Sequence, residues 1–385
     1  MMKKILILLV VLALAIPSAA LAATEFSLGG YMKLETYWDS SQNSAYMMSA
    51  VARDNNVAGT HGHFNMRSQE SRINFTIKGP KLWGATTTGF VEMDFDGVTD
   101  QNNTSSSGTW QARVRHAMFR LNWPDTELMM GQYWGLFDNF IPESADDGPM
   151  MQYATALDRI PQIRLTQKFA GDWTVAGLIG LPINTNGITA DPYAAGTSGN
   201  GQSAETPQLQ GMIQYSADLW GKAAYFGVPK PFTASVQAGW QRSISRYNAD
   251  QTVQSFGQTN YTNNGGILNQ KYLNPWIVQG GMFIPVIPTH SANLAGTASV
   301  MGSGFIGQGC ESFGMLNLEN GSGGAGYVNG GSQLAHYLGN GYFDPTLMMR
   351  FGLMAQGQYY FTNEWYLNAA YGMTRNFGVD RSLVT

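Results

Sequence analysis

The sequence predicts an all-β protein, a transmembrane antiparallel β-barrel of the up-and-down type, and three observations support this prediction. A secretory signal occupies the N-terminus, apolar and polar residues alternate from Phe26 to the end, and no apolar run of 18 residues follows residue 22. A period of two is typical of a strand with one apolar and one wet face. Without a membrane-spanning helix, many such strands behind a signal indicate an outer-membrane barrel.

Residues 1–22 have the three parts of a signal peptide. Lys3 and Lys4 form the charged region, residues 5–16 form the apolar core, and Ala20-Leu21-Ala22 supplies a cleavage site. An uncleaved membrane anchor is the alternative, and the short apolar core argues against it. We therefore expect residues 23–385 to form one barrel domain.

The composition also fits a membrane barrel. Charged residues are 12% of the chain, about half the usual share, whereas aromatic residues also reach 12% and glycine supplies 46 residues. Aromatic residues form girdles at the membrane interfaces of such barrels. The chain has 22 basic and 26 acidic residues, so without Lys3 and Lys4 20 basic residues remain and the net charge is about −6. No nucleic-acid partner is indicated.

The elements follow in order from the alternation and the turn residues. The clearest strands are expected at 26–38, 72–78, 87–96, 232–241 and 365–374. Long connections are expected at 39–62, 97–109, 138–158, 182–206, 247–270 and 307–342, and short turns at 79–82, 122–125, 170–172 and 362–364, with longer ones near 220–231 and 286–292. Alternating long and short connections match outer loops and periplasmic turns. The tally is about 13 strands.

Several segments resemble the trimeric outer-membrane porins of the DcaP-like family. These are RVRHAMFRL (113–121), MMGQYWGLFDNFIPES (129–144), RIPQIRLTQKF (159–169), FSLGGYMKLE (26–35) and GFVEMDFDG (89–97). The resemblance implies a homotrimer of sixteen-stranded barrels of the porin type that passes small anionic solutes, dicarboxylates among them. Two departures are the first strand near the cleavage site, where family members can carry a helical extension, and an end at Thr385 without a terminal aromatic strand. We therefore expect a C-terminally incomplete barrel, with 13 of 16 strands present or, alternatively, a complete barrel of 14 with one strand missed.

Basic residues on the strands and acidic residues in one loop form the candidate site. Arg113 and Arg115 are two apart on one strand and share a face, and a lipid-facing arginine would cost about 2–4 kcal/mol, so both are expected in the lumen. The pore-lining basic residues are Arg72, Arg113, Arg115, Arg164 and Lys168; the constriction-loop acids are Asp138, Glu143, Asp146, Asp147 and Asp158. If this third outer loop enters the barrel, the two sets create a transverse field that orients solutes. Alternatively, the arginines only fix the loop by salt bridges.

Other constellations are weaker. His61 and His63 could hold a metal, and Asp94, Asp96 and Asp100 could bind Ca²⁺, but ordinary loop and lumen positions explain both sets, and no metal or cofactor is expected. His116 should lie on the opposite face from Arg115, and Cys310 is interpreted as an incidental loop thiol. No catalytic constellation is present, so an enzyme is not expected.

The sequence therefore predicts a diffusion porin in the outer membrane of a Gram-negative bacterium, whose partners are small solutes and membrane lipid. Two alternatives stay open: a structural or adhesive barrel with a plugged lumen, and a barrel sleeve around a periplasmic electron carrier.

Overall fold

The computed structural model describes most of the chain after the signal segment. The described ranges are 24–40, 62–97, 111–143, 156–182, 206–248, 268–315, 333–339, 342–347 and 349–377. No helix within these ranges is long and apolar enough to cross a membrane.

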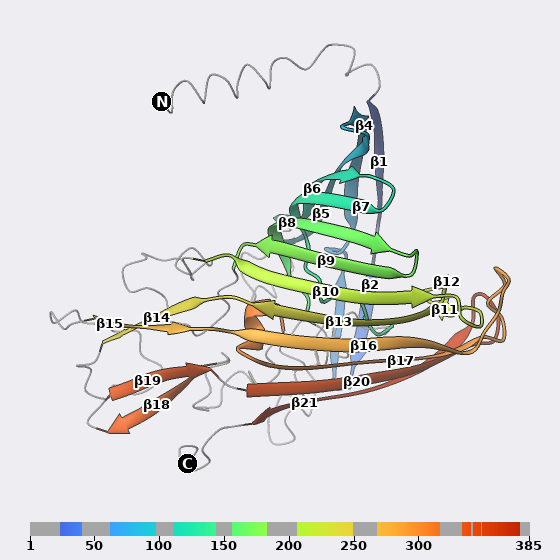
Figure 1. The fold of residues 1–385 in the computed structure, drawn as a ribbon. Helices are drawn as coiled ribbons and strands as arrows, with labels where there is room; N and C mark the ends of the chain where they lie inside the picture. Colours follow the sequence, from blue (N-terminus) through green and yellow to red (C-terminus); the bar gives the residue numbers. More distant parts are fainter. Residues whose placement is uncertain are drawn as a thin grey trace.

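One antiparallel sheet contains thirteen strands of the described residues, in the strand order β1-β4-β5-β6-β7-β8-β9-β10-β13-β16-β17-β20-β21 (Figure 1). Its strands are β1 (Glu25–Tyr31), β4 (Arg72–Leu82), β5 (Ala85–Gly97), β6 (Gln111–Asn122), β7 (Thr126–Trp134), β8 (Arg159–Phe169), β9 (Trp173–Gly180), β10 (Gln208–Ala217), β13 (Phe232–Trp240), β16 (Trp276–Ile287), β17 (Ala298–Gln308), β20 (Met349–Tyr360) and β21 (Tyr366–Phe377). Each strand pairs with its neighbours along the chain, so the topology is the expected up-and-down one. The predicted fold class is confirmed.

Four two-stranded hairpins extend the sheet at its ends. They pair β2 (Glu35–Asp39) with β3 (His63–Arg67), β11 (Ala223–Tyr225) with β12 (Val228–Lys230), β14 (Ser243–Asn248) with β15 (Leu268–Leu273), and β18 (Gln333–Gly339) with β19 (Tyr342–Leu347). In Figure 1, β14–β15 and β18–β19 extend from one end of the sheet, and β11–β12 lies at the other end with the short turns. The long and short connections therefore alternate as predicted.

The predicted strand at 26–38 is divided in the structure. β1 ends at Tyr31 and β2 begins at Glu35, and at the break the hydroxyl of Ser71 accepts from the Lys33 N–H at 3.0 Å and donates to the Lys33 carbonyl at 3.3 Å. A side chain thus satisfies the backbone groups that a partner strand would otherwise bind. The alternation of residue types continues through the break, so the pattern alone did not reveal it.

The turn expected at 79–82 is displaced. β4 continues to Leu82, its register shifts between Gly79 and Leu82, and the turn falls at Trp83 and Gly84, which have φ values of 50° and 80°. Pro80 has no N–H to donate, so it lies at the irregularity within the strand rather than in the turn.

The short turns predicted at 122–125, 170–172 and 362–364 lie between the strands as expected.

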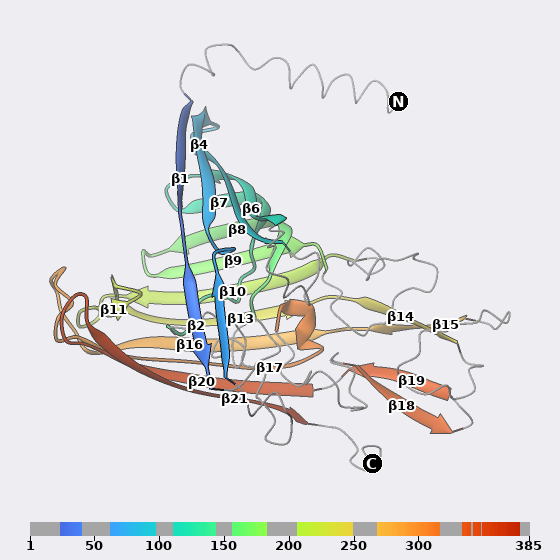
Figure 2. The same ribbon diagram turned by 180° about the vertical axis from the view of Figure 1, so that it is seen from behind.

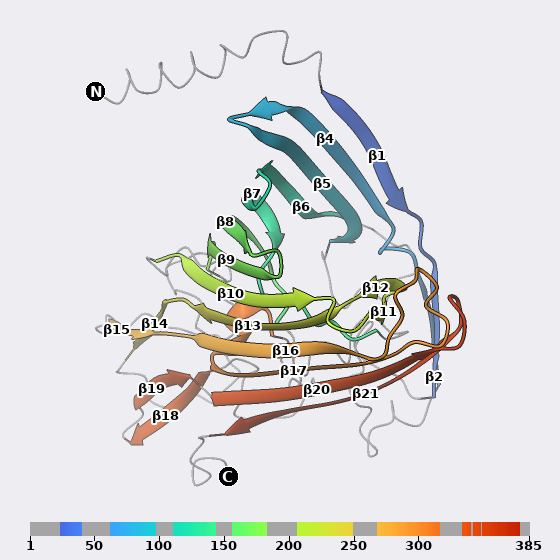
Figure 3. The ribbon, with the colours of Figure 1, turned by 45° about the vertical axis from the view of Figure 1, so that its right-hand side comes forward.

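The sheet is strongly curved. In Figures 1 and 3, β1 and β4–β6 stand at a steep angle to β13–β21, and Figure 2 shows the same curvature from behind. The edge strands are β1 and β21, and within the described residues no strand pairs with the outer side of either one.

Candidate functional site

The two faces of the sheet differ in chemistry. On β8, the outward-pointing Ile163 and Leu165 are 54% and 53% exposed, whereas Gln162, which precedes them, is buried. The inner face carries many buried glutamines, namely Gln162, Gln208, Gln210, Gln237, Gln279, Gln356 and Gln358. An apolar outside and a polar inside are the two faces of a barrel between lipid and a lumen.

Arg113 and Arg115 are held by one buried carboxylate on the neighbouring strand. Asp94 accepts from Arg113 Nε at 2.9 Å and Nη2 at 2.6 Å, and from Arg115 Nη1 at 2.7 Å. Glu92 accepts from Arg115 Nε at 2.9 Å, and Asp96 lies 3.2 Å from Arg113. The ion pairs run within the wall from β5 to β6, so carboxylates of β5 fix the direction of both arginine side chains.

A β-bulge changes the expected position of His116. The register between β5 and β6 shifts between Glu92 and Met93, so that Arg115 is an extra residue on its strand. His116 therefore also contacts Glu92, at 3.8 Å, and its ring centre lies 4.5 Å from that of Tyr133. The prediction that His116 lies on the opposite face from Arg115 is wrong, because simple alternation does not hold across a bulge.

The other predicted basic residues lie along the same wall. Arg72 Nη1 is 3.9 Å from Glu92, and Arg164 Nη2 is 3.4 Å from Glu127 Oε1. Lys168 lies on the inner face of β8, four residues beyond Arg164, and has no ion pair among the described residues.

Two further arginines were missed in the sequence. Arg120 lies 4.7 Å from the ring centre of Tyr133 and 3.7 Å from Glu127, and Arg164 approaches the same ring at 5.4 Å. Arg159 lies 4.9 Å from the ring centre of Trp134 and has no acidic partner among the described residues. Arg120 lies an odd number of residues from Arg113 and Arg115, so simple alternation places it on the opposite face, and the bulge brings it to the same face. Arg159 lies at a loop boundary, so it did not fit the alternation pattern either.

Basic side chains outnumber acidic ones on this part of the wall. The set Arg72, Arg113, Arg115, Arg120, Arg159, Arg164 and Lys168 stands against Glu92, Asp94, Asp96 and Glu127. We call the seven basic residues of this set the basic wall.

The connection between β7 and β8, here the β7–β8 loop, is bound against the inner face of other strands. The Leu136 N–H donates to Gln210 Oε1 on β10 at 2.7 Å, and Asn139 Nδ2 donates to Ser235 Oγ on β13 at 3.2 Å. On β16, Gln279 Nε2 donates to the Phe137 carbonyl at 2.8 Å. The buried backbone of the loop is thus satisfied by side chains of the sheet.

Glu143 is the last described residue of the loop before residue 156, and neutral groups bind it. Gln358 Nε2 donates to its carboxylate at 2.7 Å, and the Phe226 N–H donates to the other oxygen. Asn368 and Gln356 donate to its carbonyl at 2.8 and 2.6 Å. Glu143 therefore contacts β20, β21 and the β11–β12 hairpin rather than the arginines of the basic wall.

Aromatic side chains of the loop complete its packing. Phe140 is buried with Phe283, Met301 and Met354, and Phe137 packs in a cluster with Ile277, Phe305, Phe313 and Cys310. Cys310 lies in the short 3-10 helix η5 (Cys310–Phe313) and is buried in this cluster, so its thiol is part of the packing beneath the loop.

Two acidic residues of the loop lie near its base. Asp158 is 5% exposed; its Oδ2 accepts from Gln210 Nε2 at 3.3 Å, and its carbonyl accepts from the Gly135 N–H at 3.0 Å. Burial, with Asp138 nearby, raises the pKa of Asp158 to about 7, and burial raises the pKa of Asp138 to about 6. Asp146 and Asp147 lie outside the described residues.

The weaker candidates are resolved only in part. Asp94 and Asp96 pair with arginines, while Asp100 and His61 lie outside the described residues.

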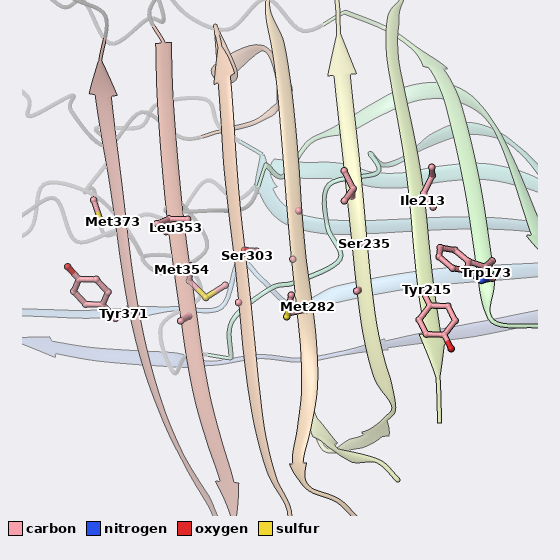
Figure 4. Close-up of a pocket in the computed structure, with 16 residues that line it drawn as sticks. Trp173, Ile213, Tyr215, Ser235, Met282, Ser303, Leu353, Met354, Tyr371 and Met373 are labelled. Atoms are coloured by element: carbon pink, nitrogen blue, oxygen red, sulfur yellow. The ribbon is translucent and has the colours of Figure 1, made fainter. Parts of the chain in front are cut away.

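A large apolar groove of about 950 Å³ lies on the outer face of the sheet (Figure 4). Trp173, Ile213 and Tyr215 stand at one side of it and Tyr371 and Met373 at the other. Between them the strands carry small residues, including Ala234, Gly280, Gly302 and Ala355. The groove faces away from the basic wall, so it is not part of the lumenal site.

The curved antiparallel sheet, its apolar outer face, its polar inner face and the loop bound inside define the fold of a porin-type transmembrane β-barrel. The chain is similar to the outer membrane channel DcaP of Acinetobacter baumannii, with a TM-score of 0.60, 15% sequence identity, and coverage of 92% of this chain and 80% of that chain. The resemblance predicted from the sequence is confirmed at the level of the fold.

Other solved structures are less similar. They include the outer membrane protein OmpT of Vibrio cholerae (TM-score 0.38, 9% identity, 92% and 89% of the two chains) and OmpF of Salmonella typhi in complex with daunomycin (TM-score 0.34, 11% identity, 91% and 97%). No protein-family model and no curated protein matches the chain.

Proposed function

We propose that this protein is a diffusion porin of a Gram-negative outer membrane that passes small hydrophilic, mainly anionic solutes such as dicarboxylates. The observation that carries this proposal is the basic wall on β4–β8, together with a long loop bound across β10, β13, β16 and β20. The similarity in fold to a protein described as an outer membrane channel supports it.

In this proposal the β7–β8 loop narrows the lumen and the basic wall attracts the solute. Asp94 and Glu92 orient the guanidinium groups of Arg113 and Arg115 and cancel part of their charge. Arg159, without an acidic partner among the described residues, adds positive potential beside Trp134. The remaining attraction stays weak, as conduction requires, because a solute must leave as readily as it enters. Selectivity then follows the charges at the narrowest point rather than the negative net charge of the chain.

A recording in a planar lipid bilayer under a salt gradient tests the function. The wild-type protein should conduct, with a reversal potential that indicates passage of anions at least equal to that of cations. Replacing Arg113 and Arg115 by Gln should shift the reversal potential toward cations and lower the uptake of succinate. If neither quantity changes, these arginines only support the structure. A protein that inserts without conductance would instead be a structural or adhesive barrel, and copurification of a haem protein would favour the sleeve for an electron carrier.

We also propose that the outer edges of β1 and β21, which no strand among the described residues pairs, are covered in the membrane. Each backbone group left unpaired in lipid costs several kcal/mol, so an open sheet edge is not stable there.

A homotrimer is the proposed assembly. The outer groove, with small residues between large apolar ones, would admit side chains of a neighbouring copy. Light scattering of the purified protein in detergent measures the number of copies, and a monomer at all concentrations would reject the trimer.

A further inference from the structure

A second cavity lies inside the sheet, between the β7–β8 loop and the end of the basic wall nearest the short turns. Its volume is about 270 Å³. Asp138 and Asn139 of the loop form one side, and Glu127, Arg164 and Lys168 of β7 and β8 form the other. The turn between β6 and β7 closes its end, so we call it the turn-side cavity.

The charges in the turn-side cavity are only partly paired with one another. Arg164 is 3.4 Å from Glu127, and Glu127 is also 3.7 Å from Arg120, so this carboxylate is balanced by two guanidinium groups. Lys168 and Asp138 make no ion pair among the described residues. The cavity therefore offers cationic donors on β8, the carboxylate of Asp138 on the loop side, and a further carboxylate, Asp125, at the turn.

From this arrangement we infer that the turn-side cavity is a binding subsite for small zwitterionic solutes, which carry one carboxylate and one ammonium group. The solute carboxylate accepts from Lys168 and from the guanidinium group of Arg164, while the ammonium group donates to Asp138. The inference rests on the proposed porin function and deepens it by naming a solute class for this position.

Electrostatics favours this class over the two simpler ones. A solute with only a carboxylate meets Asp138, Glu127 and Asp125 as like charges, and a solute with only an ammonium group meets Lys168 and Arg164. A zwitterion pairs each end and leaves no new unpaired charge, which matters in a site partly removed from water. The volume admits a molecule of the size of a single amino acid.

Flux into proteoliposomes can test the inference with three solutes of matched size. Serine carries both charges, glycerate replaces the ammonium group by a hydroxyl, and serinol replaces the carboxylate by a hydroxymethyl group. With the wild-type protein, serine flux should saturate at a lower concentration than the flux of either other solute. Asp138→Asn should raise the half-saturation concentration of serine by about fivefold, as expected for the loss of one accessible ion pair. The half-saturation concentration of glycerate should stay the same or decrease.

Lys168→Gln should raise the half-saturation concentrations of serine and glycerate but not that of serinol. Lys222→Gln is the matched control, because Lys222 lies in a turn and pairs with Asp218 outside the cavity. Equal responses of serine and glycerate to Asp138→Asn would overturn the zwitterion subsite. Saturation of all three solutes at one concentration would overturn it as well, while leaving the porin function intact. Only the absence of conductance and of all three fluxes would count against the porin itself.

Discussion

The side chain of Gln356 binds both backbone groups of Glu143. Gln356 Oε1 accepts from the Glu143 N–H at 3.1 Å, and Gln356 Nε2 donates to the Glu143 carbonyl at 2.6 Å. This pairing imitates the way one strand binds the next, although the partners are more than 200 positions apart. Together with Gln358 and Asn368, it holds the Glu143 end of the described part of the β7–β8 loop against β20 and β21.

Replacing Gln356 by Leu should release this end of the loop. Leucine has a similar size but leaves the Glu143 N–H without a partner, and a buried unsatisfied group costs about 1–3 kcal/mol. We expect a noisier channel of larger conductance and faster cleavage of the loop by protease. Gln132→Leu is the control, because Gln132 Nε2 donates to Val114 and Arg115 carbonyls within the wall. Identical traces for Gln356→Leu and wild type would contradict the proposed attachment.

Two adjacent glycines should respond differently to substitution by Ala. A Cβ atom at Gly281 would lie 2.6 Å from the Phe140 ring and 2.7 Å from the Gly302 carbonyl, whereas one at Gly280 meets no atom closer than 3.6 Å. Gly281→Ala should therefore displace Phe140 and loosen the β7–β8 loop, with lower thermal stability and altered conductance. Gly280→Ala should leave both unchanged. Equal effects of the two changes would show that Phe140 does not depend on this contact.

Asp94→Asn should make the channel more selective for anions and less stable. The change removes the carboxylate shared by Arg113 and Arg115, and the side chain of Arg115 is nearly buried. Arg115 keeps Glu92 and Arg113 keeps Asp96, so the loss of stability should be smaller than the about 3–5 kcal/mol that a buried charge costs when it has no partner left. Thermal unfolding and the reversal potential measure the two effects. Asp218→Asn, which removes an exposed pair in a turn, should change neither. A shift of the reversal potential toward cations would contradict this account.

The fold was largely predictable from the sequence because the alternation of residues such as Ile163 and Leu165 with Gln162 and Arg164 reports both faces directly. The attachment of the β7–β8 loop was not predictable. Gln210, Gln279 and Gln356 looked like ordinary polar residues of strands, and only the folded sheet brings them beneath the loop. His116 was misplaced for a related reason, since a bulge leaves no sign in the alternation before it.

Docking of the β7–β8 loop should weaken as the pH rises. Burial raises the pKa of Asp158 to about 7 from its ordinary value of 3.8, and Asp138, which faces Asp158, Arg164 and Lys230, has a pKa of about 6. A carboxyl group with a raised pKa in the docked state favours that state when protonated. The free-energy penalty that ionisation of this group places on docking is therefore absent below its ordinary pKa. The penalty grows as the pH rises through the docked-state pKa and is complete above it.

The expected result is a loop that is more resistant to protease, and a quieter channel, at about pH 5 than at about pH 8. Asp158→Asn keeps the size of the side chain and cannot ionise, so it should remove the larger part of this dependence. A smaller dependence should remain from Asp138 and should disappear in the double variant with Asp138→Asn. A wild-type loop that becomes less resistant on acidification, or a pH response unchanged in the double variant, would show that these two carboxyl groups do not control docking.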